Sequence, residues 1–291
     1  MLYLQKFLFI FKSKKKLTLI FLYFIAIIIS IFIVYKGAYG SISENELIYM
    51  KSNDPEMGLD FFYYLQDSGL TLIMFILTSI IIPNIISSDF LLYNNNKFDN
   101  LLITRITTNN YNKTEKVFNF IVSFMVILVT HLITLIIIHL FFFKISFSIN
   151  EIYMNATRQT NLFSNSLMIS LITYIILSSL GYAIFSNFIF SLQAYIKNIY
   201  LYRTLGICTS LVLYIGASVF SRYLYDSTGS MLFSTIAYFV NVSNIISPGI
   251  IKSPVLNNNY IMFYIGTVFF YCLITLILFE IKERNKYVYD K

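Results

Sequence analysis

Long apolar segments, separated by short polar ones, dominate the hydrophobic pattern of this chain. A helix of about 20 apolar residues crosses roughly 30 Å of hydrocarbon. Six segments approach or exceed that length, and the fifth is the shortest: Leu17–Tyr35, Gly69–Ser87, Val117–Phe143, Ser166–Phe190, Leu205–Phe220 and Tyr260–Glu280. The pattern predicts an all-α, polytopic membrane protein in which residues 17–291 form one domain with six transmembrane helices.

The composition supports this class. Of the 291 residues, 57% are hydrophobic and 12% are charged, and the mean hydropathy is +0.71. Soluble domains carry about twice that share of charged residues. The first apolar segment follows a basic stretch, but it exceeds the roughly 7–15 residues of a signal-peptide core. We therefore expect it to remain as a membrane span.

The distribution of charge predicts the orientation of the spans. With the N-terminus inside, 15 of the 21 Lys and Arg residues fall in cytoplasmic segments. Basic residues favour the cytoplasmic side, so both termini are expected in the cytoplasm. The external loop 36–68 with its flanking positions holds six acidic residues and two lysines. The net charge of +7 lies beside membrane spans and therefore gives no indication of nucleic-acid binding.

Two further segments have helical patterns of their own. In residues 1–16, Leu4, Phe7, Leu8 and Phe11 share one helical face, which is typical of an amphipathic helix in the cytoplasmic interface. An inward extension of the first span explains the same pattern equally well. The external segment 221–259 contains the apolar stretch Met231–Ser247, interrupted by polar residues. A seventh span would place the basic C-terminus outside, so a re-entrant or interfacial helical pair is expected.

The sequence lacks several kinds of catalytic motif. It has no P-loop, no G-x-S-x-G nucleophile elbow and no H-E-x-x-H zinc motif. Acidic residues are almost missing from the predicted spans, which disfavours intramembrane catalysis and ion-coupled carriers. Cys208 and Cys272 fall inside spans and are expected to be buried free thiols. We predict no enzyme activity, cofactor or metal in this chain.

Three polar residues in the spans are candidates for a transport pathway. Asn84 lies near the inner end of the second span, and His131 and His139 lie in the third. The histidines are separated by roughly 12 Å along a helix, too far apart to hold one metal ion. Neutral histidines bonded to a neighbouring helix are favoured, and histidines facing a pathway are the alternative.

The cytoplasmic loop 88–116 is unusually polar for this chain and has an ordered pattern. Asn94–Asn96 is a natural helix start. After it, Phe98, Leu101, Leu102 and Ile106 fall on one helical face, and Thr107–Asn110 is expected to break the helix. A surface helix lying on its own membrane explains this pattern without any partner.

The same loop resembles the cytoplasmic loop of ABC type-2 transporter permeases. In that family an acidic residue, a leucine-rich helix, a Thr/Ser-rich break, an aromatic residue and a lysine follow the second span. The order here is Asp89, "NLLITRI", "TTNN", Tyr111 and Lys116. Two departures concern Asp89, where the family usually has Glu, and "FLLYNNN", where it often has a glycine. The second leaves the register of the coupling helix open by a residue or two.

The resemblance implies a membrane subunit of an ABC exporter. A coupling helix would seat Phe98, Leu101, Leu102 and Ile106 in a groove of a separate ATPase, with Arg105 at the rim. Asp89, Tyr111 and Lys116 would hold the ends of the adjoining spans. Two ATPase subunits that bind ATP and Mg, and a second permease copy or a paralogue, would complete the assembly.

The spans are rich in Phe, Ile, Leu and Tyr, which suits an amphipathic or apolar cargo, with a membrane-active or antimicrobial peptide favoured. A second hypothesis is a non-transporting scaffold or sensor that binds a cationic ligand through the acidic external loop.

Overall fold

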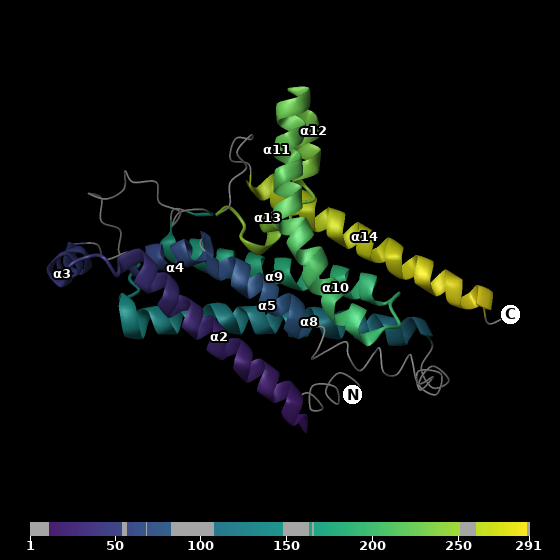
Figure 1. Cartoon of the computed structure of the whole chain (residues 1–291), viewed down its shortest axis with the longest axis horizontal. Coiled ribbons are helices and arrows are strands. Elements are labelled where there is room, and N and C mark those ends of the chain that lie inside the picture. Colours follow the sequence, from purple (N-terminus) through teal and green to yellow (C-terminus); the bar gives the residue numbers. More distant parts are fainter. Residues whose placement is uncertain are drawn as a thin grey trace.

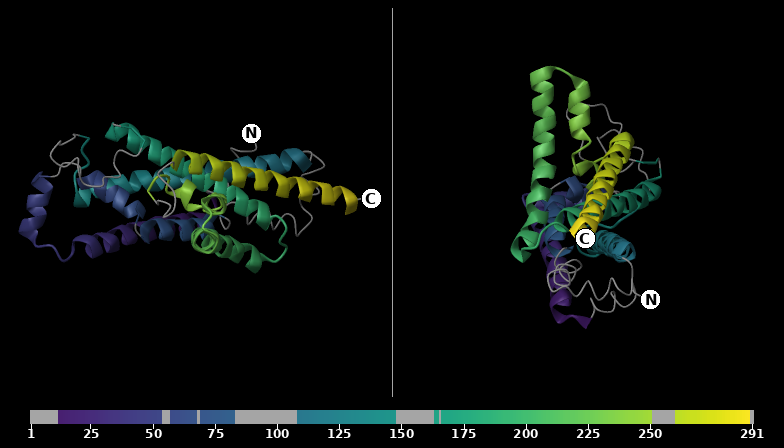
Figure 2. Two further views of the ribbon diagram at one scale, coloured as in Figure 1. Left: turned by 90° about the horizontal axis from the view of Figure 1, so that it is seen from above. Right: turned by 90° about the vertical axis from the view of Figure 1, so that its right-hand side faces the viewer.

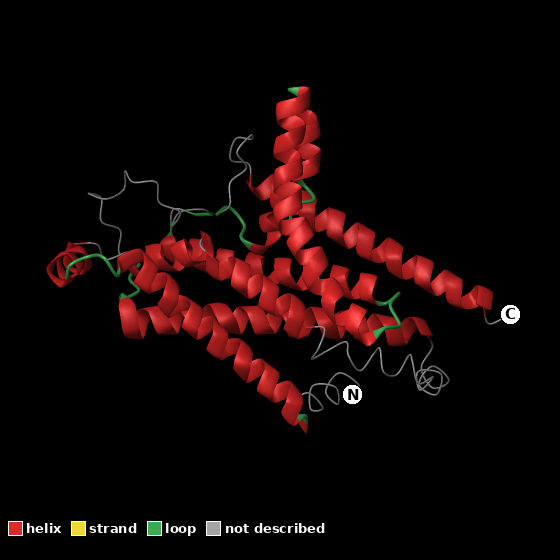
Figure 3. Ribbon diagram, viewed as in Figure 1, coloured by secondary structure: helices red, strands yellow, loops and turns green. Residues whose placement is uncertain are grey.

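The structure, a computed structural model, describes residues 12–53, 57–67, 69–82, 108–147, 163–164, 166–250 and 260–289. Its elements are α2 (Lys14–Tyr39), α3 (Glu44–Asn53), α4 (Met57–Asp67), α5 (Gly69–Ile82), α8 (Thr108–Ile137), η2 (Ile138–Phe142), α9 (Leu167–Gln193), α10 (Ile199–Leu211), η5 (Val212–Gly216), α11 (Ala217–Thr228), α12 (Met231–Tyr238), α13 (Ser243–Ile246) and α14 (Tyr260–Tyr289). η2 and η5 are single π-helical turns. Over these ranges the chain is all-helical, without a strand (Figure 3).

Five helical segments are long and apolar enough to cross a membrane: Lys14–Tyr39, Lys113–Phe142, Leu167–Gln193, Tyr200–Thr228 and Ile261–Lys282. They match the first, third, fourth, fifth and sixth predicted spans. The fifth continues to Thr228, beyond its predicted end at Phe220. The chain is thus a helical protein with the architecture of a polytopic membrane protein.

The second predicted span, Gly69–Ser87, differs most from expectation. Its helix α5 is described only to Ile82 and has 14 residues. Among the described residues, a sixth span is found only if α4 and α5 together form one, bent by 54° between Met57–Asp67 and Leu70–Ser79; residues 83–87 of the predicted span lie outside the described part. α4 belongs to the predicted external loop 36–68, yet Leu59, Phe61 and Leu65 are fully buried. That loop therefore contributes to the core, because the aromatic face of α4 fills the space between α2, α5 and η2.

Contacts between helices define the direction of each one. α2 and α8 run parallel, with Tyr23 bonded to Thr130 and Phe32 packed on Phe141. α9 runs antiparallel to α8, because Asn119 contacts Asn187 whereas His131 contacts Ser178. α14 runs parallel to α9, because Tyr264 contacts Leu177 whereas Leu278 contacts Tyr195. α8 therefore begins and α14 ends towards the same end of the bundle, and α2 runs from that half towards the other end (Figures 1 and 2). We call the end where α8 begins and α14 ends the terminal end.

The core beneath the opposite end is aromatic. Tyr35 of α2 packs against Phe61 of α4 and against Phe142 and Phe143 after α8, with ring centroids 4.2–5.8 Å apart. The Tyr35–Phe61 pair is edge-to-face and the other two pairs are tilted; aromatic pairs of these kinds add stability beyond the area that the rings bury. They hold α4 against the bundle and thereby bring its last turn next to α9.

The predicted external segment 221–259 forms two structures over its described part. α11 and α12 make a hairpin that leaves the bundle steeply (Figure 1, green), joined by the bond from the Ser221 hydroxyl to the Ser234 carbonyl. After α12 the chain turns back, and residues 241–250, with the single helical turn α13, are all buried. A re-entrant or interfacial helical pair was expected here. The structure shows a hairpin followed by a turn back, and we call residues 241–250 the re-entrant segment because they return into the bundle; their position in a membrane stays a prediction. Residues 251–259 lie outside the described part.

Candidate functional site

The pathway candidate Asn84 and most site residues of the predicted coupling loop lie outside the described part of the chain; the loop residues are Asp89, Phe98, Leu101, Leu102, Arg105 and Ile106. Residues 1–11 of the predicted interfacial helix 1–16 also lie outside it. The structure therefore places only Tyr111 and Lys116 of the loop residues, both in the first turns of α8, and describes the side chain of Lys116 alone.

The start of α8 corrects one detail of the loop. The helix begins at Thr108, so Asn109 and Asn110 belong to its first turn and do not form part of a break. The Lys116 ammonium lies 3.7 Å from the centroid of the Phe279 ring in α14. This cation–π contact joins the terminal ends of α8 and α14.

A line of polar side chains holds α8 and α9 together, which we call the polar seam. On α9, polar residues recur at every fourth position and so form a stripe that winds slowly around the helix, with neighbouring members on the same side: Ser170, Tyr174, Ser178, Tyr182 and Ser186. Towards the terminal end, the Asn119 amide donates to Asn187 Oδ1 at 2.8 Å, and Ser123 Oγ donates to Ser186 Oγ at 2.9 Å. Such bonds stabilise helix pairs in membranes because lipid offers no competing partner.

The two histidines have different surroundings. His131 is fully buried in the seam, with Nε2 3.1 Å from Ser178 Oγ. Because Ser178 Oγ donates its one proton to the Ile246 carbonyl at 2.6 Å, a neutral His131 is the donor through Nε2. His139 is exposed, and its Nδ1 accepts the backbone N–H of Ile145 at 3.2 Å. His131 thus makes the predicted hydrogen bond to a neighbouring helix. His139 instead stabilises the stretch of chain that follows η2.

The seam widens into a buried group of polar side chains around Tyr174. Its hydroxyl donates to Gln66 Oε1 of α4 at 3.4 Å, and its ring lies 5.5 Å from Tyr63 and 5.9 Å from His131. Ser247, just beyond α13, lies close to the same hydroxyl. We call these residues the polar cluster: Tyr63, Gln66, His131, Tyr174, Ser178 and Ser247. Three separate segments therefore meet on α9 at one depth.

Side-chain hydrogen bonds hold the re-entrant segment, residues 241–250, and the residues just before it. The Asn244 amide donates to the Tyr238 carbonyl at 2.8 Å and to Thr267 Oγ1 of α14 at 3.0 Å. The Tyr271 hydroxyl donates to the Val240 carbonyl at 2.6 Å. Irregular backbone is tolerated inside a membrane protein only when protein or water satisfies it, and these bonds do so.

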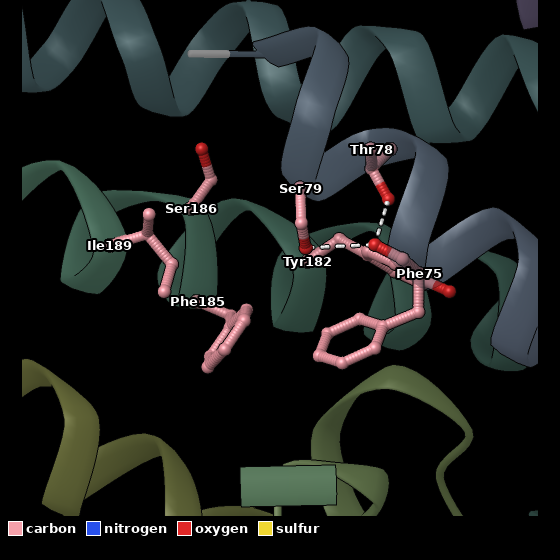
Figure 4. A pocket seen from close by; sticks show the side chains of 7 residues that line it. All are labelled: Phe75, Thr78, Ser79, Tyr182, Phe185, Ser186 and Ile189. Atoms are coloured by element: carbon pink, nitrogen blue, oxygen red, sulfur yellow. Dashed lines mark hydrogen bonds between the residues drawn. The ribbon is translucent and has the colours of Figure 1, made fainter. Parts of the chain in front are cut away.

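A small cavity of about 20 Å³ lies between α5 and α9 (Figure 4). It is lined by Phe75, Thr78, Ser79, Tyr182, Phe185, Ser186 and Ile189. The hydroxyls of Thr78 and Ser79 are bonded to the Phe75 carbonyl, as the dashed lines in Figure 4 show. The space suffices for one water molecule and is too small for a transported solute.

The chemistry of the site is that of neutral polar groups. No group of three or more His, Cys, Asp or Glu residues suited to a metal ion occurs among the described residues. Asp67 is exposed and ends α4, at the bend of the α4–α5 pair. Cys208 and Cys272 are free, as expected, but exposed on the bundle surface where burial was predicted. Hydrogen bonding and packing are thus what this site offers.

Sequence reasoning identified His131 but missed Gln66, Tyr174 and Ser178. The four-residue spacing of polar residues on α9 is a signal that could have revealed the seam.

No family model matches this chain, and neither a curated protein nor a solved structure matches it.

Proposed function

We propose that this chain is the membrane subunit of an ABC exporter in a bacterial cell membrane, with both termini in the cytoplasm. ATP hydrolysed by a separate subunit would drive export of an amphipathic or apolar cargo, with a membrane-active peptide favoured. The observation that carries the proposal is the order of residues in loop 88–116, from Asp89 through "NLLITRI" and "TTNN" to Tyr111 and Lys116.

The form of α8 supports a mechanical role for that loop. α8 has 30 residues in one helix, a length of about 45 Å. It begins at Thr108, two residues after Ile106, the last residue of the predicted coupling face. A force applied to residues 98–106 would therefore act directly on a rigid rod that crosses the bundle, without a flexible joint of many residues between them.

The contacts of α8 offer a route for that displacement. α8 is bonded to α9 along the polar seam, and α9 holds the re-entrant segment through the bond from Ser178 to the Ile246 carbonyl. Lys116 also joins α8 to α14 through Phe279. Movement of α8 would thus shift α9, α14 and the segment between α12 and α14 together.

Co-purification in mild detergent, followed by identification of every bound chain, tests the assembly. An ABC ATPase is the expected partner. The double variant Leu101→Asp with Leu102→Asp should remove its binding and its coupled ATP hydrolysis, because two carboxylates would enter an apolar groove. The matched control, Asn100→Asp with Thr104→Asp, adds the same charge on the opposite helical face and should leave binding intact. Equal behaviour of the two double variants would contradict the proposal.

A non-transporting scaffold that binds a cationic ligand is the alternative. The structure leaves α3 available for this role, since Glu44 and Glu46 are exposed on it. α4 is different, because it is mostly buried and its acidic residues flank the core. ATP-dependent movement of a peptide into vesicles that hold this chain and its ATPase would favour transport; binding without movement would favour the scaffold.

A further inference from the structure

The polar cluster is enclosed by protein. Its six members come from α4, α8, α9 and the residue that follows α13, and each of them is at most 2% exposed. The cluster lies in the half of the bundle away from the terminal end, beside the bend between α4 and α5. Neither lipid nor bulk solvent reaches it through the described residues.

Four polar atoms of this cluster make no hydrogen bond of ordinary geometry within the described part of the chain: Tyr63 Oη, Gln66 Nε2, His131 Nδ1 and Ser247 Oγ. Two of them face another hydroxyl at longer range: Tyr63 Oη faces that of Ser170, and Ser247 Oγ faces that of Tyr174. A buried polar atom without a partner costs more than an ordinary hydrogen bond contributes, and such atoms are rare in native proteins. Four of them within one cluster indicate that something else satisfies them.

The chemistry of these atoms identifies the ligand. Gln66 Nε2 has only protons to donate, and His131 Nδ1, in a ring that donates through Nε2, can only accept. The hydroxyls of Tyr63 and Ser247 can do either. No member carries a formal charge, so an ion would find no counter-charge here. Water donates and accepts in equal number and commonly fills buried polar sites of this kind.

We propose that the polar cluster holds ordered internal water, which joins α4, α8 and the re-entrant segment to one another. Direct bonds join α8 and residues 241–250 to α9 through Ser178, but the bond to α4, from Tyr174 to Gln66, is long, at 3.4 Å. The terminal half of the seam is instead bonded directly, at 2.8 Å between Asn119 and Asn187. Bonds through water exchange partners readily. The cluster is thus a hydrated joint where residues 241–250 can move relative to α4, while α8 and α9 stay bonded.

Radiolytic hydroxyl-radical labelling of the full chain in lipid nanodiscs tests this. Radicals form from water in place, so a buried side chain is labelled only when water touches it. Tyr63 and Tyr174 should be labelled several-fold faster than Tyr23 and Tyr271. The two control tyrosines are equally buried but are not members of the polar cluster, and their hydroxyls are bonded to Thr130 and to the Val240 carbonyl. Labelling of all four at the same slow rate would overturn the proposal.

A pair of serine variants sharpens the result. Ser247→Ala removes one water ligand and should lower labelling of Tyr174. Ser191→Ala also removes a buried hydroxyl, but that hydroxyl is already bonded to the Phe188 carbonyl at 2.6 Å, so labelling of Tyr174 should not change. If Ser247→Ala does not fold, the comparison of tyrosines in the unaltered chain still decides. No ATPase is needed, so this test can fail while the proposed export function stands, or succeed while it falls.

Discussion

Gly181→Ala offers a sharp test of how the re-entrant segment is seated. A Cβ atom built on Gly181 of α9 would lie 1.9 Å from the backbone oxygen of Ile245 and 2.5 Å from its carbonyl carbon. Both atoms are backbone, so no side-chain rotation relieves the clash. The Cβ–oxygen distance must grow from 1.9 Å to an ordinary contact of 3.4 Å, so the two segments must separate by about 1.5 Å.

That displacement has a calculable effect. The bond from Ser178 Oγ to the Ile246 carbonyl is 2.6 Å long, and a shift of about 1.5 Å would stretch it beyond hydrogen-bonding range. Overpacking of a tight interface costs about 1–3 kcal/mol, and a lost interhelical bond adds about 0.6 kcal/mol. Alanine recovers up to about 1 kcal/mol over glycine in a helix. The expected net loss of stability is about 1–2.5 kcal/mol.

Thermal unfolding of the purified protein in mild detergent measures this loss. Gly37→Ala is the matched control, because its Cβ would meet nothing within 4 Å and α2 would gain helix propensity. Gly37→Ala should therefore unfold at the wild-type temperature or slightly above it. If Gly181→Ala is as stable as Gly37→Ala, the close approach of the re-entrant segment to α9 is refuted.

Three further substitutions probe other contacts. His131→Ala should destabilise the fold more than His139→Ala in the same unfolding assay, because it loses a buried interhelical bond and leaves a cavity; the reverse order would contradict the placement of the two rings. Lys116→Met should cost about 0.5–2 kcal/mol through the lost contact with Phe279, whereas Lys116→Arg should retain most of it; equal losses would argue against the cation–π contact. Asn198 accepts the N–H of Tyr200 at 2.9 Å as the N-cap of α10, so Asn198→Ala should cost about 1 kcal/mol and Asn198→Asp much less; hydrogen exchange in the first turn of α10 distinguishes them.

The second predicted span shows where reasoning from the sequence reached its limit. The apolar run after Gly69 indicated a helix correctly, and α5 begins at that residue. The helix before it, α4, was assigned to the external loop 36–68, whose six acidic residues fitted that side of the membrane. Its burial depends on aromatic contacts with Tyr35 and Phe142, which are distant in the sequence.

The polar cluster was hidden for a related reason. Gln66 and Tyr174 are 108 residues apart, and each is an ordinary polar residue beside apolar neighbours. His131 alone attracted attention, since an ionisable side chain within an apolar run is unusual.

The amino-acid sequence by itself determined the class of this protein, the positions of its long apolar helices and the parallel or antiparallel order that their alternation requires. Those properties depend on local composition and on the fixed thickness of a bilayer. Only the tertiary structure decided that α4 is buried, that residues 241–250 turn back into the bundle, and that three segments meet on Tyr174. Those outcomes depend on shape complementarity and hydrogen bonding between residues far apart in the chain, which no local pattern records.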